Sequence, residues 1–201
     1  MRMPERLGRR SLQLVVGLYL YGLGIALVVR SRLGSAPWDV LTQGIINHVP
    51  LSFGAVTVIT SVAVLLLWIP LRQRPGLGSL VNALLVGPFA DLSFLFLPEL
   101  DALWLRIPLL GLGIVAVGAA TGLYIGAGFG PGPRDGLMTG LHVVTGRPVW
   151  IVRTALEVTV VTIGWLLGGT VGPGTLAFAL LIGPLCQFFL RVFAIPPSKD
   201  R

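Results

Sequence analysis

Two charged side chains interrupt a long apolar stretch, in the segment WIVRTALEVTV. Arg153 and Glu157 are four residues apart, so they would share one face of a helix. If the stretch enters a membrane at Pro148, a rise of about 1.5 Å per residue places Glu157 about 13 Å deep, near the middle. An ionisable group there is typical of a proton-binding or substrate-binding site, although an ion pair that only neutralises both charges is the alternative. Because arginine before glutamate is the less favourable order on a helix, we expect each to meet a further partner as well.

A second acid, Asp91, lies in another apolar stretch, shortly after a Gly87-Pro88 pair where we expect the helix to break. It is a further candidate for proton or substrate binding, and the alternative is that it caps the helix beyond the break. Neither histidine belongs to an HExxH zinc motif, and no GxSxG nucleophile motif occurs. The single cysteine, Cys186, leaves no intramolecular disulfide. We therefore expect no enzyme activity, no catalytic residue, no metal site and no cofactor.

Two segments rich in glycine and proline, LGSAPWDVLTQG and GFGPGPRDGLMTG, follow the first and fourth apolar stretches. Proline lacks the amide donor and glycine adds backbone entropy, so neither segment continues a helix cheaply. Non-helical backbone at membrane depth is tolerated only where it is buried in protein or lines a wet cavity. A surface connector is the alternative. The residues expected to form these two helix breaks are Gly34, Pro37, Gly130 and Pro133.

An aspartate follows each break and is expected to cap a short helix. Asp39 would cap residues 40–49 and Asp135 would cap residues 136–145, because an aspartate side chain accepts hydrogen bonds from the free amides of a helix start. Both helices are too short and too polar to cross a membrane, so we expect them to be re-entrant or interfacial. Together with the adjacent Arg134, these aspartates complete the set of candidate binding residues.

The composition predicts a membrane protein. Of the 201 residues, 54% are hydrophobic and 11% are charged, and the mean hydropathy is +0.87, whereas a soluble domain carries about 25% charged residues. The net charge of +7 does not indicate a nucleic-acid partner, because no soluble domain would hold the basic surface. A bilayer crossing takes about 20 apolar residues. The expected spans are residues 11–29, 50–70, 76–97, 107–127, 148–167 and 173–193.

The two halves of the chain resemble each other at a constant offset of 96 residues. GSLVNALLVGP and GTLAFALLIGP, which begin at Gly78 and Gly174, are identical at seven of eleven positions, and the two helix breaks align at the same offset. We therefore predict an all-α polytopic membrane bundle of two three-helix repeats, residues 1–105 and 106–201, that form one membrane domain. Three crossings per repeat place the second repeat in the opposite orientation, so the repeat should be inverted.

The basic residues predict the orientation in the membrane. With the N-terminus in the cytoplasm, twelve of the fifteen lie on the cytoplasmic side, including Arg2, Lys199 and Arg201, as the positive-inside rule requires. Both termini should therefore be cytoplasmic. The exceptions on the outer side are Arg30, Arg32 and Arg106, and the tryptophans expected as interface anchors near span ends are Trp38, Trp68, Trp104, Trp150 and Trp165.

The segments GSAPWDVL, GLYIGAGFGPGPRDGLMTG and PVWIVRTALEV, with the paired helices that end in Gly-Pro, resemble the YczE/YyaS/YitT group of bacterial integral membrane proteins, and its YczE branch in particular. The resemblance covers nearly the whole chain. It implies a multi-pass protein of the bacterial inner membrane, in a group that includes suggested transporters. It carries no catalytic or substrate-binding residue over to this sequence.

An inverted repeat with interrupted helices in matching positions is a recurrent design of secondary transporters, whose sites lie near the membrane midplane at the repeat interface. The sequence thus favours a transporter of an unknown small solute, with the intramembrane acids available for proton coupling. The alternative is a non-transporting membrane protein that regulates or supports a partner complex. The expected surroundings are the lipid bilayer, and assembly into a homo-oligomer stays open.

Overall fold

The computed structural model describes residues 3–193; Arg2, Lys199 and Arg201, which contribute to the predicted orientation, lie outside the described residues. Helices make up nearly all of this part of the chain. They are α1 (Met3–Ser31), α2 (Pro37–Ile46), α3 (Phe53–Leu67), α4 (Leu77–Phe96), α5 (Leu103–Gly126), α6 (Pro133–Thr145), α7 (Val149–Leu166) and α8 (Pro173–Phe193). The all-α class predicted from the sequence is confirmed.

Five of the helices are long and apolar enough to cross a membrane: α1, α4, α5, α7 and α8. The second predicted span corresponds to α3, which is apolar but has only 15 residues. A bilayer core of about 30 Å needs about 20 helical residues, so α3 alone is shorter than a full crossing. Hydrogen-bonded turns follow it up to Arg72.

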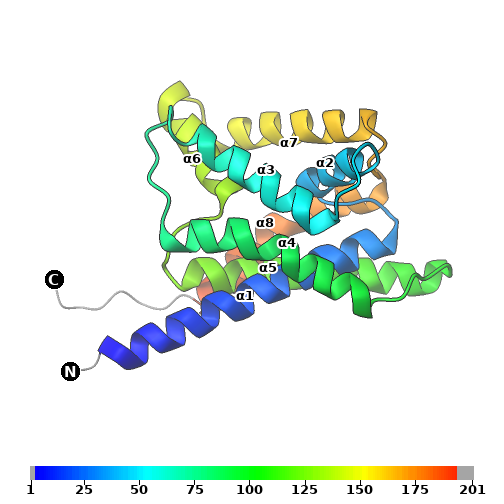
Figure 1. Ribbon diagram of the computed structural model, residues 1–201, viewed down its shortest axis with the longest axis horizontal. Helices are drawn as coiled ribbons and strands as arrows, with labels where there is room; N and C mark the ends of the chain where they lie inside the picture. Colours follow the sequence, from blue (N-terminus) through cyan, green and yellow to red (C-terminus); the bar gives the residue numbers. More distant parts are fainter. Residues whose placement is uncertain (1–2, 194–201) are drawn as a thin grey trace.

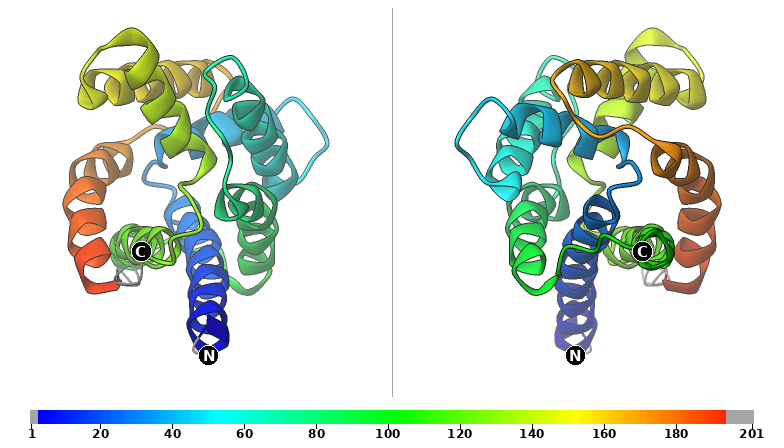
Figure 2. Two further views of the ribbon diagram at one scale, coloured as in Figure 1. Left: turned by 90° about the vertical axis from the view of Figure 1, so that its left-hand side faces the viewer. Right: turned by 90° about the vertical axis from the view of Figure 1, so that its right-hand side faces the viewer.

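Helices α1 and α5 cross closely in the lower part of the view in Figures 1 and 2, and glycines replace side chains at their contact. A Cβ atom at Gly17 of α1 would lie 2.9 Å from the backbone nitrogen of Tyr124, and one at Gly113 of α5 would lie 2.9 Å from that of Val28. Small residues at such a crossing let two membrane helices approach backbone to backbone. The two contacts are equivalent under the offset of 96 residues: Gly113 lies 96 residues after Gly17, and Val28 lies 96 residues before Tyr124. Helices α1 and α5 therefore exchange roles between the two contacts.

The outer helices pack on this central pair and on each other. Helix α4 packs on α1, α8 packs on α5, and α2 lies against α7. The glycines spaced four apart in α5 form the α8 contact, because Cβ atoms at Gly118, Gly122 and Gly126 would each lie within 2.8 Å of that helix. Helix α3 also packs along α4, whereas α7 makes little direct contact with α8.

The predicted break at Gly87-Pro88 is wrong, because α4 runs without interruption from Leu77 to Phe96. Proline removes one backbone hydrogen bond but is tolerated in membrane helices when neighbouring helices support the local backbone. Here α3 supplies that support: a Cβ at Gly87 would lie 2.3 Å from the carbonyl oxygen of Gly54. The Gly-Pro pair therefore marks a close helix contact.

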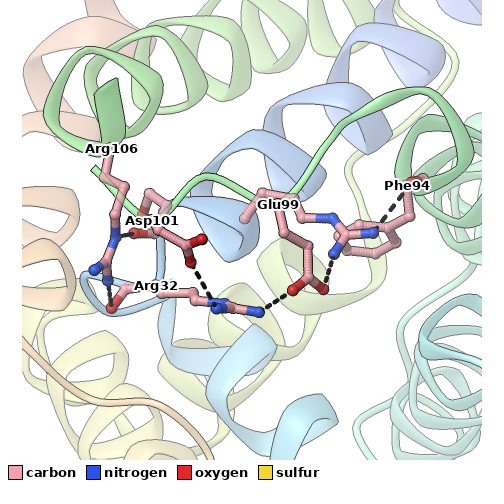
Figure 3. Close-up of polar contacts among 7 residues, drawn as sticks. Arg32, Phe94, Glu99, Asp101 and Arg106 are labelled. Atoms are coloured by element: carbon pink, nitrogen blue, oxygen red, sulfur yellow. Dashed lines mark hydrogen bonds and ion pairs between the residues drawn. The ribbon is translucent and has the colours of Figure 1, made fainter. Parts of the chain in front are cut away.

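The beginning of α1 and the end of α8 lie at the same end of the bundle. The side-chain amide of Gln13 donates to the carbonyl oxygens of Leu123 and Phe193, both at 3.0 Å. Gln13 therefore ties α1 to the last turns of α5 and α8. Arg30, Glu99 and Arg106 lie at the opposite end of α1 (Figure 3).

Candidate functional site

A cavity of about 220 Å³ lies in the middle of the bundle and is lined by side chains from all eight described helices. Its walls include the first turns of α2 and α6, together with Arg153 and Glu157 of α7. The structure therefore brings most of the predicted site residues together. Asp39, Arg134, Asp135, Arg153 and Glu157 all face this space, with Pro37 and Pro133 at its edge.

The two helix breaks have the same backbone. Gly34 has φ +116° and Gly130 has φ +115°, a region that side chains other than hydrogen rarely allow. Each is followed three residues later by a proline in the first turn of a short helix, α2 or α6. Proline suits that position, because its fixed φ fits the helix and its missing amide has no helical partner there.

Each break is held by the first turn of a distant helix. The amide of Gly174 in α8 donates to the carbonyl of Leu33 at 2.7 Å, and the amide of Gly78 in α4 donates to the carbonyl of Phe129 at 2.9 Å. These hydrogen bonds satisfy carbonyl groups that the breaks would otherwise leave free inside the protein. The break at Gly34 is buried, whereas the break at Gly130 has exposed residues at Gly128 and Pro131. Both are nevertheless anchored to a helix of the other half of the chain.

The aspartates after the breaks do not cap the short helices as predicted. The N-cap residues are Ala36 and Gly132, neither helix start has a side-chain cap, and the helices begin at Pro37 and Pro133. The prolines set the helix starts three residues earlier than the aspartate signal indicates. Asp39 and Asp135 lie in the first turn, where a carboxylate still interacts favourably with the helix dipole.

The Asp39 carboxylate lies opposite Arg134 across the cavity. Its Oδ1 is 3.8 Å from the nearest Arg134 nitrogen, and the Arg134 guanidinium stacks over the Trp38 ring at 5.2 Å from the centroid. Asp39 is 2% exposed. Burial raises the pKa of the Asp39 carboxyl from 3.8 to about 6, an effect that the nearby Arg134 charge partly offsets.

The Asp135 carboxylate has a different partner. The Tyr124 hydroxyl on α5 donates to Asp135 Oδ2 at 2.7 Å. The Tyr124 ring in turn packs edge-on against Tyr21 of α1, with ring centroids 6.0 Å apart. Both tyrosines line the cavity, and the sequence analysis missed them. Their chain positions alone give no signal of this hydrogen bond.

Arg153 and Glu157 form the predicted pair along α7, with Arg153 Nε 2.9 Å from Glu157 Oε1. Within the described residues neither side chain has the additional charged partner that its order on the helix led us to expect. The pair is only partly buried, since α7 lies at the edge of the bundle. Thr57 and Ser61 of α3, 96 residues earlier, line the opposite wall of the cavity and are buried.

Asp91 lies away from the cavity. Its Oδ1 accepts a hydrogen bond of 2.7 Å from the amide of Gly54, in the first turn of α3. Because α4 is continuous, Asp91 caps a neighbouring helix and not the continuation of its own. The geometry gives it a structural contact and no access to the other candidate residues.

Two of the five tryptophans differ from the prediction of interface anchors. Trp38 lines the cavity. Trp68 is buried at the end of α3, and its Nε1 donates to the Pro133 carbonyl at 3.0 Å. It fills the space beside Gly136, where a Cβ atom would lie 1.9 Å from the indole ring. The other three tryptophans are exposed on the bundle surface, as anchors should be.

A pair of arginines supports the helix ends, a contact that the sequence analysis did not predict. Arg10 Nε donates to the carbonyl of Ala127 at 2.7 Å, and Arg106 Nε donates to the carbonyl of Ser31 at 2.6 Å. Each arginine thus satisfies a C-terminal carbonyl of a helix from the other half of the chain. Their spacing of 96 residues was a signal that could have found them.

The three arginines that the sequence analysis placed on the outer side are paired with acids or carbonyls. Arg30 and Arg32 both contact the Glu99 carboxylate, and Arg32 lies 3.9 Å from Asp101 (Figure 3). Arg106 Nη2 donates to the Arg32 carbonyl at 2.7 Å. The local charge at this end is therefore nearly balanced. Among the described residues, no group of three His, Cys, Asp or Glu side chains is arranged to hold a metal ion.

The sequence pattern of a family of unknown function, DUF6198, matches residues 8–191. An uncharacterized protein of Haemophilus influenzae is 41% identical over 184 residues, which cover 92% of this chain and 84% of that protein. The uncharacterized membrane protein YczE of Bacillus subtilis is 34% identical over 176 residues, 87% of this chain and 82% of its own length. YyaS of the same organism is 29% identical over 182 residues, 88% and 90% of the two chains. No solved structure matches this chain.

These relatives confirm the resemblance to the YczE-like group. With the apolar helices, they make the chain a multi-pass membrane protein.

Proposed function

Because the chain belongs to DUF6198, a family of unknown function, we propose from its own geometry that it is a secondary transporter of a small solute. The observation that carries this proposal is the central cavity, which is lined by both helix breaks and by the charged pair on α7. Broken helices that meet at a central site are the usual means by which a transporter presents backbone and charge to a solute. Asp39, Arg134, Asp135, Arg153 and Glu157 are the proposed binding residues.

We propose that the cavity lies between two inverted repeats, residues 1–105 and 106–201, which form one membrane domain. The exchanged contacts at an offset of 96 residues support this: Gly17 against Tyr124 and Gly113 against Val28, and the paired hydrogen bonds at the two breaks. In this arrangement α3 supplies the second of six crossings, and α2 and α6 are re-entrant helices. The bacterial inner membrane, with both termini in the cytoplasm, is the proposed location.

Proton coupling is the proposed driving mechanism. Glu157 lies beside the cavity with Arg153, and Asp39 is buried across it. A carboxyl group in such a place exchanges protons with whichever side of the membrane the cavity opens to. A carboxyl group that binds a proton when the solute leaves would couple proton movement to solute movement.

A proteoliposome uptake screen with an imposed pH gradient tests the transport proposal. Glu157→Gln should abolish uptake while expression and detergent stability stay near wild type. Glu99→Gln is the matched control, since it also removes an ion-paired glutamate but at the far end of the bundle. Uptake by Glu99→Gln should equal that of the wild type.

Two results would count against the site. If Glu157→Gln and Arg153→Gln only destabilise, and the double change restores stability without altering uptake, the pair is an internal brace. If no solute of the screen is moved under any gradient, the alternative of a non-transporting protein that supports a partner complex is favoured.

A further inference from the structure

One buried polar atom in the cavity wall lacks a hydrogen bond. Among the described residues, Oδ1 of Asp39 has less than 1 Å² of exposed area and no hydrogen-bond partner. A buried acceptor in this state costs about 1–3 kcal/mol, and more when it is charged. Native proteins rarely keep such an atom without a reason, so a missing partner is the first explanation to consider.

Arg134 satisfies Asp39 only in part. The separation of 3.8 Å is within reach of electrostatic attraction but too long for a hydrogen bond. The guanidinium instead stacks over the Trp38 ring, the neighbour of Asp39 on α2. A carboxylate beside an aromatic face is the environment that proteins use for cationic ligands. In the empty cavity, a side chain of this protein occupies that environment.

The other carboxylates of the cavity are already engaged. Asp135 accepts a hydrogen bond from Tyr124, and Glu157 is paired with Arg153. With all acids ionised, three carboxylates face two guanidinium groups, so the side chains leave one negative charge in excess. The positive ends of α2 and α6, each equivalent to about half a charge, offset much of this excess. The preference for a cation therefore rests on the Asp39 oxygen, which can only accept a hydrogen bond when it is ionised, and on the Trp38 ring beside it.

We propose that the cavity binds a small monovalent organic cation with N–H donors, a primary ammonium or a guanidinium, between the Asp39 carboxylate and the Trp38 ring. This proposal rests on the proposed function and names the class of solute for the same site. Arg134 acts as a placeholder, and the cation displaces its guanidinium from Asp39 and Trp38. The cavity volume of about 220 Å³ suits a solute of a few non-hydrogen atoms, because one water occupies about 30 Å³ in the liquid.

Calorimetry on the detergent-purified full chain tests the proposal with three probes of similar size. Methylguanidinium carries the proposed charge and donors, N-methylurea is its neutral counterpart, and acetate is the anion. The wild type should bind methylguanidinium and neither of the others. Asp39→Asn should weaken that binding at least tenfold, whereas Asp101→Asn, the same change on an exposed outer loop, should leave it unchanged.

Arg134→Gln is a second variant, and its expected effect on methylguanidinium affinity is opposite to that of Asp39→Asn. Removal of the placeholder should tighten methylguanidinium binding about tenfold, and the added Asp39→Asn change should cancel this gain. Binding that occurs only in Arg134→Gln and never in the wild type would overturn the proposal, because the probe would then merely fill the space of a lost side chain. Equal binding of acetate or of N-methylurea would also overturn it.

The same protein in proteoliposomes separates this proposal from the transport proposal. Binding of methylguanidinium without any uptake would leave the cation site standing and reject transport. Uptake of a different solute without methylguanidinium binding would reject the cation and leave transport standing.

Discussion

The helix breaks before α2 and before α6 share a backbone but differ in how their aspartates are held. Both have a glycine near φ +115°, a proline at the helix start and an aspartate two residues later. Asp135 accepts a hydrogen bond from Tyr124, whereas Asp39 meets only the distant charge of Arg134. The residue 96 positions before Tyr124 is Val28, which has no hydroxyl to donate.

A second difference lies directly after the prolines. Residue 38 is a tryptophan and its counterpart, residue 134, is an arginine, and the two side chains stack on each other across the cavity. Glycine and proline thus fix the same path at both breaks, while single changes at equivalent positions make the polar environment unequal. Two halves with the same backbone path can therefore contribute different charges to one central site.

The largest expected effect concerns the two glycines. Gly34→Ala should destabilise the protein by about 4 kcal/mol, because positive-φ strain adds to a clash with backbone; a Cβ there would lie 2.7 Å from the Gly172 nitrogen. Gly130→Ala should cost about 2 kcal/mol, since its nearest backbone atom, Cα of Gly76, would lie 3.2 Å away. Thermal unfolding in detergent measures both.

Gly111→Ala is the control for these glycine changes, because a Cβ at Gly111 would have no neighbour within 4 Å and the residue is helical. It should be neutral or slightly stabilising. Equal losses for Gly34→Ala and Gly130→Ala would contradict the difference in packing between the two breaks.

The pH dependence of stability should report the burial of Asp39. Folding raises the Asp39 pKa from 3.8 to about 6. The folded state therefore gains stability as the pH falls from about 6 to about 4, and this gain is lost when the pH rises back through about 6. Two pKa units correspond to at most about 3 kcal/mol. The other ionisable groups that line the cavity are Tyr21, Tyr124, Arg134, Asp135, Arg153, Glu157 and Cys186.

Asp39→Asn should remove this gain, so melting curves at about pH 7.5 and about pH 4.5 should differ less for the variant than for the wild type. Asp101→Asn, on the exposed loop between α4 and α5, serves as the control and should keep the wild-type difference. An unchanged pH profile in Asp39→Asn would show that burial does not perturb this carboxyl.

Tyr124→Phe should make the environment of Asp135 resemble that of Asp39. Loss of the 2.7 Å hydrogen bond to Asp135 should cost about 2 kcal/mol, because the acceptor is charged and part-buried. Tyr19→Phe is the control, since Tyr19 is exposed on the bundle surface. Equal unfolding midpoints for Tyr124→Phe and the wild type would show that the hydroxyl contributes nothing to the difference between the breaks.

The smallest effect is expected for the arginines at the helix ends. Arg106→Gln should cost about 1 kcal/mol and Arg10→Gln somewhat less, because Arg106 donates to two carbonyls and Arg10 to one. Arg9→Gln, at the exposed neighbour of Arg10, should change nothing. A larger loss at residue 10 than at residue 106 would reverse the expected order.

The sequence by itself predicted the all-α membrane fold, the two helix breaks and the charged residues that meet in the cavity. These features depend on local chemistry: apolar runs of sufficient length, glycine and proline where a helix cannot continue, and charges four residues apart on α7. The predicted starts of α2 and α6 were late by three residues, because the proline signal at the helix start outweighs the aspartate signal.

Only the tertiary structure decided which of these residues face one another. Asp39 meets Arg134 across 95 positions of chain, Asp91 caps α3 in place of its own helix, and Trp68 is buried against α6 instead of facing lipid. Such contacts depend on how helices are placed side by side, which a local pattern does not encode. The glycines fix how close the helices come, and that distance determines whether a carboxylate finds a hydroxyl, as Asp135 does, or is left with a guanidinium 3.8 Å away, as Asp39 is.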